Sequence, residues 1–329
     1  MFVGKFFLAL SGVTWIYRQY TSLHTNDRAL DENDRMSLPR DKLFFTALLS
    51  KIVYRLPEHI KVLKEENMDG LKKVPLPANE YQLLSSVFED QYDQSVFPIL
   101  IEDKNKDAQM YVWLSKSTKT LVLAYRGTSS KSDMITDVDF DLVKLFTDDK
   151  QKHKKVRVHH GFHQQFTSIE KKIIDICEKY RGCYDKIIHT GHSLGGGLAT
   201  LSSVVFSDKF PELAHECYTF GSPRPGNSAF QALYRKTFKF RKNSYRVINH
   251  HDAVTMTPMN FFYDHVHDAL QFGDDGEVEE SSEMTGMRRV MRQLLHLQRD
   301  SIDDHMMSTY LFNIYRGLFS GEEAVCRPK

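Results

Sequence analysis

The chain has 329 residues, of which 41% are hydrophobic and 26% are charged, and its formal net charge is +1. This composition is typical of a globular protein with one large core, and a charge this close to zero argues against nucleic acid as a partner. The four cysteines show no Cys-x-x-Cys spacing, so they indicate neither a zinc site nor a disulfide scaffold. We expect buried thiols, and a single disulfide involving Cys177 or Cys183 stays open.

Residues 1–40 are set apart as an N-terminal apolar segment and a polar linker. The apolar run 6–17 follows one lysine and is too short to span a bilayer, so a signal peptide, a membrane-facing helix and a first helix of the domain all fit it. The sequence contains no Asn-x-Ser/Thr acceptor, which argues weakly against a glycosylating secretory route. A secreted or membrane-associated location and a cytoplasmic one therefore fit the sequence equally well.

Residues 41–329 are expected to form one domain. Apolar residues recur at helical spacing between residues 43 and 53, and Pro57 opens a second short helix. Strand-like runs follow at 97–102, 110–114 and 120–125, separated by polar turns that predict two hairpins. After them, strands at 187–190, 217–220 and 245–249 alternate with helices at 162–176, 194–205 and 227–238. This alternation predicts an α/β fold with a mainly parallel central sheet, helices on both faces and an antiparallel meander at its N-terminal side.

Three later segments have unusual charge patterns. Residues 150–157 are basic and are expected to form a solvated loop, with contact to anionic head groups as the alternative. Residues 273–283 are acidic and are also expected to form a loop. Residues 287–295 combine an apolar stripe with arginines, which favours a packed helix over an interfacial one.

A Gly-x-Ser-x-Gly pentapeptide, Gly-His-Ser-Leu-Gly at residues 191–195, lies between the apolar run 187–190 and a helical pattern. Strand, turn and helix in this order are the context that a nucleophile elbow requires. A Cβ at either glycine would strike the neighbouring backbone of so tight a turn, which explains why both are glycine. Ser193 is therefore the predicted nucleophile, and a glycine-rich turn that contains a serine by chance is the less specific alternative.

A serine hydroxyl is a weak nucleophile at neutral pH, so Ser193 needs a base within hydrogen-bond reach and an acid that orients this base. In hydrolases with this elbow, the acid and the histidine follow the serine in the chain. Asp252 comes just after the strand-like run 245–249, and the carboxyl ends of parallel strands are where open sheets place their sites. Asp252 is therefore the predicted acid.

Four further segments resemble those of a known family. They are Tyr-Arg-Gly-Thr-Ser-Ser at 125–130, Val-His-His-Gly-Phe at 158–162, Phe-Gly-Ser-Pro-Arg-Pro-Gly-Asn at 220–227, and Asp-x-Val at 252–254 followed by Pro258. Their order and spacing resemble those of the class 3 (fungal-type) lipase family of α/β-hydrolases, over residues 41–317. The resemblance implies an α/β-hydrolase fold and assigns Asp252 to a catalytic triad.

The base of that triad is chosen among His265, His267, His296 and His305. Asp-His-Met-Met-Ser-Thr-Tyr at residues 304–310 resembles the family's final Asp-His element, which favours His305. His265 lies in a Tyr-x-His-Val segment whose histidine is structural in the family, and it shares one face of an expected strand with His267. His296 is expected on a helix. We therefore predict His305 as the base, with His265 or His267 as the alternative.

The oxyanion of a tetrahedral intermediate needs hydrogen-bond donors that are held in place in advance. The backbone N–H of Leu194, directly after the nucleophile and at the start of a helix, is the first predicted donor. The resemblance implies Thr128, which follows the Arg-Gly pair, as the second donor through its backbone N–H and its hydroxyl.

Residues 129–142 have apolar side chains on one face of a helical pattern and aspartates on the others. The resembling lipases carry their lid at this place, so we expect a lid here, with an ordinary surface helix as the alternative. Exposing its four or five apolar side chains in water would cost roughly 1.5 to 3 kcal/mol each. The open state should therefore be rare without a lipid interface, which predicts interfacial activation.

Together, these features predict a serine carboxylic ester hydrolase, an acylglycerol lipase, that acts through Ser193, His305 and Asp252 and a covalent acyl-enzyme intermediate. The expected partner is a lipid ester at a lipid–water interface, with a peripheral contact to the membrane and no nucleic acid. The reaction requires no metal and no organic cofactor. A phospholipase or soluble-ester esterase on the same fold is one alternative, and a catalytically inactive lipase-like interaction module is another.

Overall fold

The computed structural model describes residues 28–29, 37–54, 72–73, 98–115, 117–128, 141–148, 150–250, 252–258, 262–273, 277–281 and 303–319. Four expected features lie outside these residues: the apolar segment 6–17, the helix after Pro57, most of the lid (129–140) and the helix at 287–295. In the part described, no helix is both long enough and apolar enough to cross a membrane.

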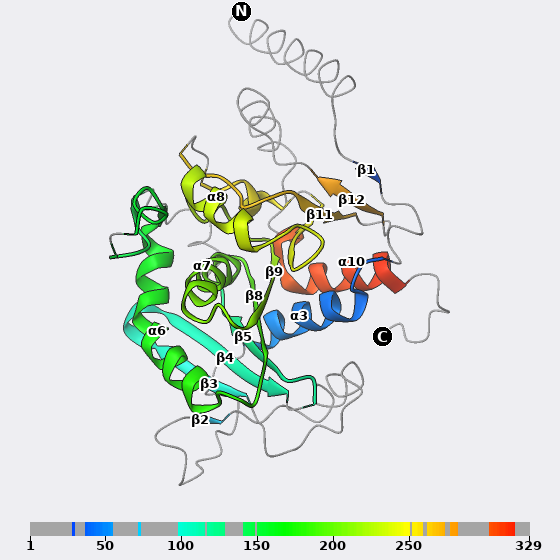
Figure 1. Ribbon diagram of the computed structural model, residues 1–329. Coiled ribbons are helices and arrows are strands. Elements are labelled where there is room, and N and C mark those ends of the chain that lie inside the picture. Colours follow the sequence, from blue (N-terminus) through cyan, green and yellow to red (C-terminus); the bar gives the residue numbers. More distant parts are fainter. Residues whose placement is uncertain are drawn as a thin grey trace, which may run out of the picture.

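A ten-stranded sheet runs through the centre of the described structure (Figure 1). Its strand order is β1-β12-β11-β10-β9-β8-β5-β4-β3-β2. The strands are β1 (Arg28–Ala29), β2 (Lys72–Lys73), β3 (Ile99–Asp103), β4 (Ala108–Ser115), β5 (Thr120–Tyr125), β8 (Lys186–His192), β9 (Ala214–Phe220), β10 (Ser244–Asn249), β11 (Ala269–Phe272) and β12 (Val278–Ser281). Strands β5, β8, β9, β10 and β11 are parallel, and antiparallel pairs flank them on both sides. The predicted sheet, with its antiparallel meander β3-β4-β5, is confirmed.

The register of the central strands decides where the site forms. All residues of β5 and β10 are buried, as expected of parallel strands that are covered on both faces. Tyr125 at the end of β5 pairs with Gly191 in β8, and His192 at the end of β8 pairs with Phe220 at the end of β9. The loops that follow these strands therefore meet at one edge of the sheet.

Helices cover both faces of the sheet, as predicted (Figure 1). Helices α6 (His160–Lys179), α7 (Leu194–Lys209) and α8 (Ser228–Thr237) pack on one face. Helices α3 (Arg40–Ile52) and α10 (Met307–Phe319) pack on the other face and against each other. The expected stripe of α6 is buried in the first of these cores: Phe162, Phe166, Ile169, Ile173 and Ile176.

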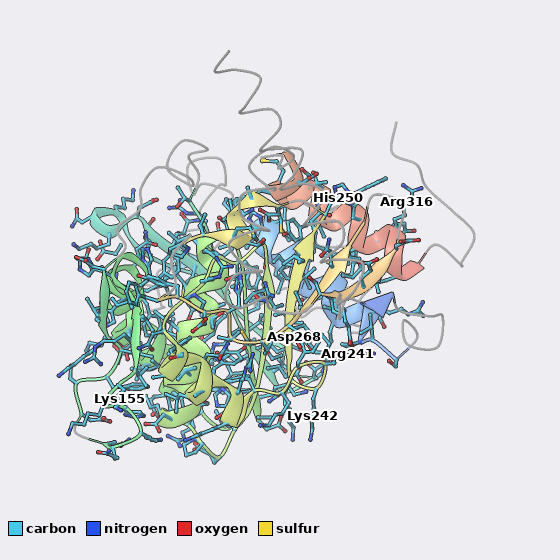
Figure 2. The ribbon with its side chains drawn as sticks, turned by 90° about the horizontal axis from the view of Figure 1, so that it is seen from above. Lys155, Arg241, Lys242, His250, Asp268 and Arg316 are labelled. Carbon is cyan, nitrogen blue, oxygen red and sulfur yellow. The ribbon has the colours of Figure 1, made fainter. Side chains whose placement is uncertain are left out.

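Short elements complete the described fold. β6 (Leu142–Lys144) and β7 (Arg157–His159) form a separate antiparallel pair. Their connection carries the basic segment, where Lys152, Lys154 and Lys155 are exposed, as expected of a solvated loop. Lys155 lies at one edge of the molecule, far from Arg241 and Lys242, so these basic side chains do not gather in one patch (Figure 2). Three 3₁₀ turns are η2 (Lys104–Lys106), η3 (Ala253–Met256) and η4 (Asp303–His305).

The expectation of a loop at 273–283 is wrong, because β12 lies within this stretch and pairs with β11. Val278 and Ser281 are buried, and the two glutamates between them are half-buried. A four-residue strand with so few apolar side chains gives no periodic signal. Its partner β1 likewise lies inside the stretch expected as a polar linker.

Two smaller expectations are settled by the described residues. His265 and His267 lie in a bent segment that precedes β11, and not in a strand. Cys177 and Cys217 are buried free thiols, while Cys183 is free and exposed. The disulfide that the sequence left open is therefore not formed among these three cysteines.

Candidate active site

Ser193 stands between β8 and α7, where the elbow predicts it. Its backbone has φ +59° and ψ −134°, a conformation that non-glycine residues rarely adopt. A Cβ on Gly191 would lie 2.2 Å from the carbonyl oxygen of Gly195, and a Cβ on Gly195 would lie 2.3 Å from that of Tyr125. The N–H of Ser193 donates to the carbonyl oxygen of Phe220 at 2.9 Å. Close backbone packing thus holds the serine in a strained, defined position.

Asp252 and His305 form a buried, hydrogen-bonded pair next to this turn. Asp252 follows β10 and caps η3, where its Oδ1 accepts the N–H of Val254 at 2.9 Å. Its Oδ2 lies 2.8 Å from Nδ1 of His305, the last residue of η4. Because a carboxylate only accepts, we assign the proton to Nδ1 and the lone pair to Nε2. In the described structure this Nε2 is buried without a hydrogen-bond partner, so it is available to accept a proton.

Gly221 allows the acid and the base to approach the elbow. It follows β9 with φ +57°, and a Cβ there would lie 2.7 Å from Oδ2 of Asp252 and 3.1 Å from the ring of His305. Phe220 holds the N–H of Ser193, and Gly221 contacts the acid–base pair. Two adjacent residues at the end of β9 therefore bring the three predicted catalytic residues together.

Tyr310 is a second donor to the acid that the sequence reasoning missed. Its O–H donates to Oδ2 of Asp252 at 2.6 Å and accepts the backbone N–H of Asn249 at 3.0 Å. Burial and the neighbouring carboxylate raise the pKa of the Tyr310 phenol well above its usual 10, so it stays a donor. Asn249 also donates to the carbonyl oxygen of Asp304 at 2.8 Å. The end of β10 thus fixes both the acid and the turn that carries His305.

His192 links the nucleophile to the base. Its Nε2 lies 2.7 Å from the carbonyl oxygen of His305, and its Nδ1 lies 2.8 Å from the hydroxyl of Tyr54. A carbonyl only accepts, so Nε2 carries the proton and Nδ1 accepts from Tyr54. Burial, reinforced by His305, lowers the pKa of His192 well below 6.5 and keeps its ring neutral. No periodic pattern marks Tyr54 for this role, because it lies far from the elbow in sequence.

The two predicted oxyanion donors belong to segments that adjoin the nucleophile. Leu194 is the first residue of α7, and the first N–H groups of a helix have no partner within the helix. Thr128 is half-buried and follows Gly127, where a Cβ would lie 3.1 Å from Cβ of Ser193. Arg126 anchors this loop, because its guanidinium donates to the side chain of Gln109 at 3.1 Å and forms an ion pair with Asp107.

The alternative histidines are engaged elsewhere. Nε2 of His265 bonds to the carbonyl oxygen of Thr255 at 2.7 Å. His267 bonds to the hydroxyl of Ser244 at 2.6 Å and to the carbonyl oxygen of Asp268 at 2.9 Å, and burial lowers its pKa to about 4. His296 lies outside the described residues. Asp252 therefore meets His305, and not His265 or His267.

Only the end of the expected lid is described. The carbonyl oxygen of Asp141 accepts the N–H of His160 at 2.9 Å and the hydroxyl of Tyr263 at 3.1 Å. Leu142 then begins β6. These contacts anchor the C-terminal end of the segment near the start of α6.

Comparison with known proteins finds lipases. The model of the family "Lipase (class 3)" matches residues 122–262. A lipase of Rhizopus niveus is 30% identical over 174 residues, which are 51% of this chain and 41% of the relative. The secreted mono- and diacylglycerol lipase MDL3 of Malassezia globosa is 30% identical over 151 residues, which are 44% of this chain and 49% of the relative. The chain thus spans less than half the length of these curated relatives.

Solved structures of lipases share the fold. A Rhizomucor miehei triacylglyceride lipase superimposes with a TM-score of 0.60 at 20% identity, covering 89% of this chain and 99% of the other. A triacylglycerol lipase whose catalytic centre is described as a serine protease triad gives a TM-score of 0.61 at 22% identity, with the same coverage. With its elbow, its sheet and these structural neighbours, this chain has the α/β-hydrolase fold, and over residues 122–262 it matches the class 3 lipase family.

Proposed function

We propose that the protein is a serine carboxylic ester hydrolase that cleaves acylglycerols, with Ser193, His305 and Asp252 as its catalytic triad. The observation that carries the proposal is the buried His305–Asp252 pair: the His305 ring packs against His192, the residue before Ser193, and its Nε2 has no hydrogen-bond partner in the described structure. A structural histidine buried to this extent would be expected to have both nitrogens bonded, as His267 does. In His305 only Nδ1 is bonded, and Nε2 can accept a proton.

In the acylation step, Oγ of Ser193 attacks the ester carbonyl while Nε2 of His305 takes the hydroxyl proton. The imidazolium that forms keeps its Nδ1–H on Oδ2 of Asp252, which stabilises the positive charge. His305 then gives its proton to the departing alcohol, and the acyl group stays on Ser193. Water reverses these roles and releases the fatty acid.

The backbone N–H of Leu194 and Thr128 stabilise the negative charge of the tetrahedral intermediate by hydrogen bonds. The start of α7 favours this charge, because the helix dipole places partial positive charge there. Loss of one such donor costs on the order of 3 kcal/mol in transition-state energy. The neutral ring of His192 suits the same site, because a second imidazolium beside His305 would oppose its protonation.

The names of the relatives support acylglycerols as the substrate class. They include triacylglycerol lipases and mono- and diacylglycerol lipases, so either preference fits this chain. We also propose that residues 129–142 form the lid, that the substrate is taken from a lipid–water interface through a peripheral contact, and that residues 41–329 are one hydrolase domain.

The proposal is tested with a fluorophosphonate probe, which forms a covalent bond with an activated serine. The wild-type chain should be labelled, and Ser193→Ala should not. His305→Ala should abolish ester hydrolysis, whereas His265→Ala should lower the unfolding temperature and leave the remaining folded protein active. A wild-type chain that fails to react would be an inactive module. Parallel assays on triacylglycerol, monoacylglycerol and phosphatidylcholine then assign the substrate, and a preference for phosphatidylcholine would make the chain a phospholipase.

A further inference from the structure

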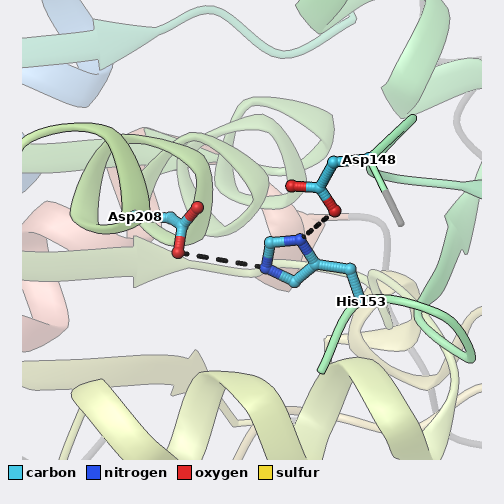
Figure 3. A group of neighbouring side chains, drawn as sticks. All are labelled: Asp148, His153 and Asp208. Atoms are coloured by element: carbon cyan, nitrogen blue, oxygen red, sulfur yellow. Dashed lines mark hydrogen bonds and ion pairs between the residues drawn. The ribbon is translucent and has the colours of Figure 1, made fainter. Parts of the chain in front are cut away.

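A second group of chemically active side chains consists of Asp148, His153 and Asp208, with the two carboxylates facing the ring of His153 (Figure 3). It lies at the end of α7, whereas Ser193 precedes the start of this helix. Asp148 and His153 belong to the connection between β6 and β7, and Asp208 is the last residue but one of α7. Helix α7 has 16 residues, so Asp208 lies roughly 20 Å from the nucleophile. The ester chemistry therefore does not explain this group.

His153 is held in one orientation. Its side chain is 1% exposed and stacks on Phe146 with ring centroids 3.6 Å apart. Nδ1 lies 2.7 Å from Oδ1 of Asp148, so Nδ1 carries the proton and Nε2 carries the lone pair. Nε2 points at Oδ1 of Asp208 at 3.9 Å and is buried without a hydrogen-bond partner in the described structure (Figure 3). A lone pair and a carboxylate oxygen thus face each other across a gap that is too long for a hydrogen bond.

A zinc ion fits this gap. Zn–N and Zn–O bonds of about 2.1 Å at a tetrahedral angle place the two ligand atoms about 3.4 Å apart. The observed 3.9 Å reaches this separation after a shift of about half an ångström. A carboxylate that accepts the other N–H of a ligating histidine is the usual partner at zinc sites, and Asp148 occupies that place. An imidazole ligand favours zinc over magnesium or calcium, which prefer oxygen.

Two lysines compete with the ion for Asp208. Nζ of Lys150 lies 2.8 Å from Oδ2, and Lys152 bonds to Oδ1, the oxygen that faces His153. Their side chains are 53% and 45% exposed, so either can swing into water without uncovering a core. The lysines neutralise Asp208 when no ion is bound, and Lys152 is the more direct competitor.

We propose that this group is a zinc site, with Nε2 of His153 and Oδ1 of Asp208 as ligands, Asp148 orienting the histidine, and water in the remaining positions. The ion would fasten the connection between β6 and β7 to the end of α7. It would stabilise the fold without contacting the reacting atoms. The cysteine spacing could not predict it, because its ligands are one histidine and one aspartate that lie far apart in the sequence.

The test uses the full chain after chelator treatment and removal of the chelator. Zinc chloride is titrated by calorimetry, and thermal unfolding is followed with and without the ion. Zinc should raise the unfolding temperature, and magnesium and calcium should not. Asp208→Asn, a partly exposed position that should not disturb folding, weakens a direct ligand and should lower zinc affinity by at least the roughly 10-fold that loss of an outer-shell partner costs. Lys152→Met should raise it several-fold.

Asp175→Asn is the matched control, because Asp175 is also paired with a lysine, Lys171 at 2.7 Å, but belongs to a different helix. It should bind zinc like the wild type. Binding that is absent from the wild type, or equal in Asp208→Asn and the wild type, would overturn the proposal. A stabilisation that appears on acidification and not with zinc would also overturn the proposal. His153 faces Asp148, Asp208, Lys150 and Lys152, and a proton on its ring would then be the bridging cation. Ester hydrolysis should be the same in all three variants.

Discussion

Gly221→Ala tests whether backbone space at the end of β9 sets the geometry of the site. The added Cβ would lie 2.7 Å from Oδ2 of Asp252 and 3.1 Å from the His305 ring. Ordinary van der Waals contact begins at 3.4 Å, so the carboxylate must move by about 0.7 Å. A misplacement of about 1 Å in an active site can reduce the rate about 100-fold, so kcat on a soluble ester should fall by roughly that factor.

The backbone conformation contributes a separate effect that a control can remove. Gly221 has φ +57°, and alanine in the left-handed region costs roughly 1 to 2 kcal/mol of stability. Gly182→Ala is the matched variant, because Gly182 has φ +88° and nothing within 4 Å of the added Cβ. Both variants should lose this backbone contribution in urea unfolding, Gly221→Ala should lose more because of its clash, and only Gly221→Ala should lose activity. Wild-type kcat in Gly221→Ala, or an equal loss in Gly182→Ala, would refute the reasoning.

Three further predictions follow from the same structure. Tyr310→Phe keeps the ring but removes a hydrogen bond to a charged acceptor and leaves the N–H of Asn249 unpaired. Urea unfolding should therefore show that the free energy of unfolding is lower by roughly 2 to 4 kcal/mol. An unchanged free energy of unfolding would show that the bond contributes nothing. Acid should destabilise the fold, because burial lowers the pKa of His189 and His192 well below 6.5 and that of His267 to about 4. Below pH 6.5 the unfolded chain therefore binds more protons than the folded chain. The free energy of unfolding is highest above pH 6.5 and falls as the pH drops towards 4, by about 1.4 kcal/mol per pH unit for each histidine. Unfolding curves measured across this range check the slope, and a flat profile would contradict it. Finally, hydrolysis of a short-chain ester should accelerate when the substrate exceeds its solubility limit, and a rate that shows no break there would argue against a lid at 129–142.

The sequence was sufficient to predict the elements whose signal is local. The apolar run before Ser193 and the glycines of the elbow specify a strand, a tight turn and a helix, and all three are found. The stripe of α6 was equally clear, because its apolar residues recur at a single period. Asp252 follows from the rule that open sheets place their sites at the carboxyl ends of strands.

The remaining features depend on contacts between distant segments, which no local pattern records. Tyr54 meets His192, and Tyr310 meets Asp252, only after the sheet and both helices of one face have assembled. The pairing of β12 with β11 was hidden because glutamates occupy half of a strand that is only four residues long. His153 and Asp208 show the same limit, since the fold alone brings them together.

The position of η4 and α10 has a consequence for how activity is acquired. His305 belongs to the last described segment of the chain, and α10 packs against α3, the first described helix. A ribosome releases the elbow and the acid well before this segment, and a domain folds as a unit. A nascent chain can therefore carry its serine and its acid while it still lacks a base. Esterase activity should appear only when the two ends of the domain have docked, which makes catalysis a direct report of completed folding.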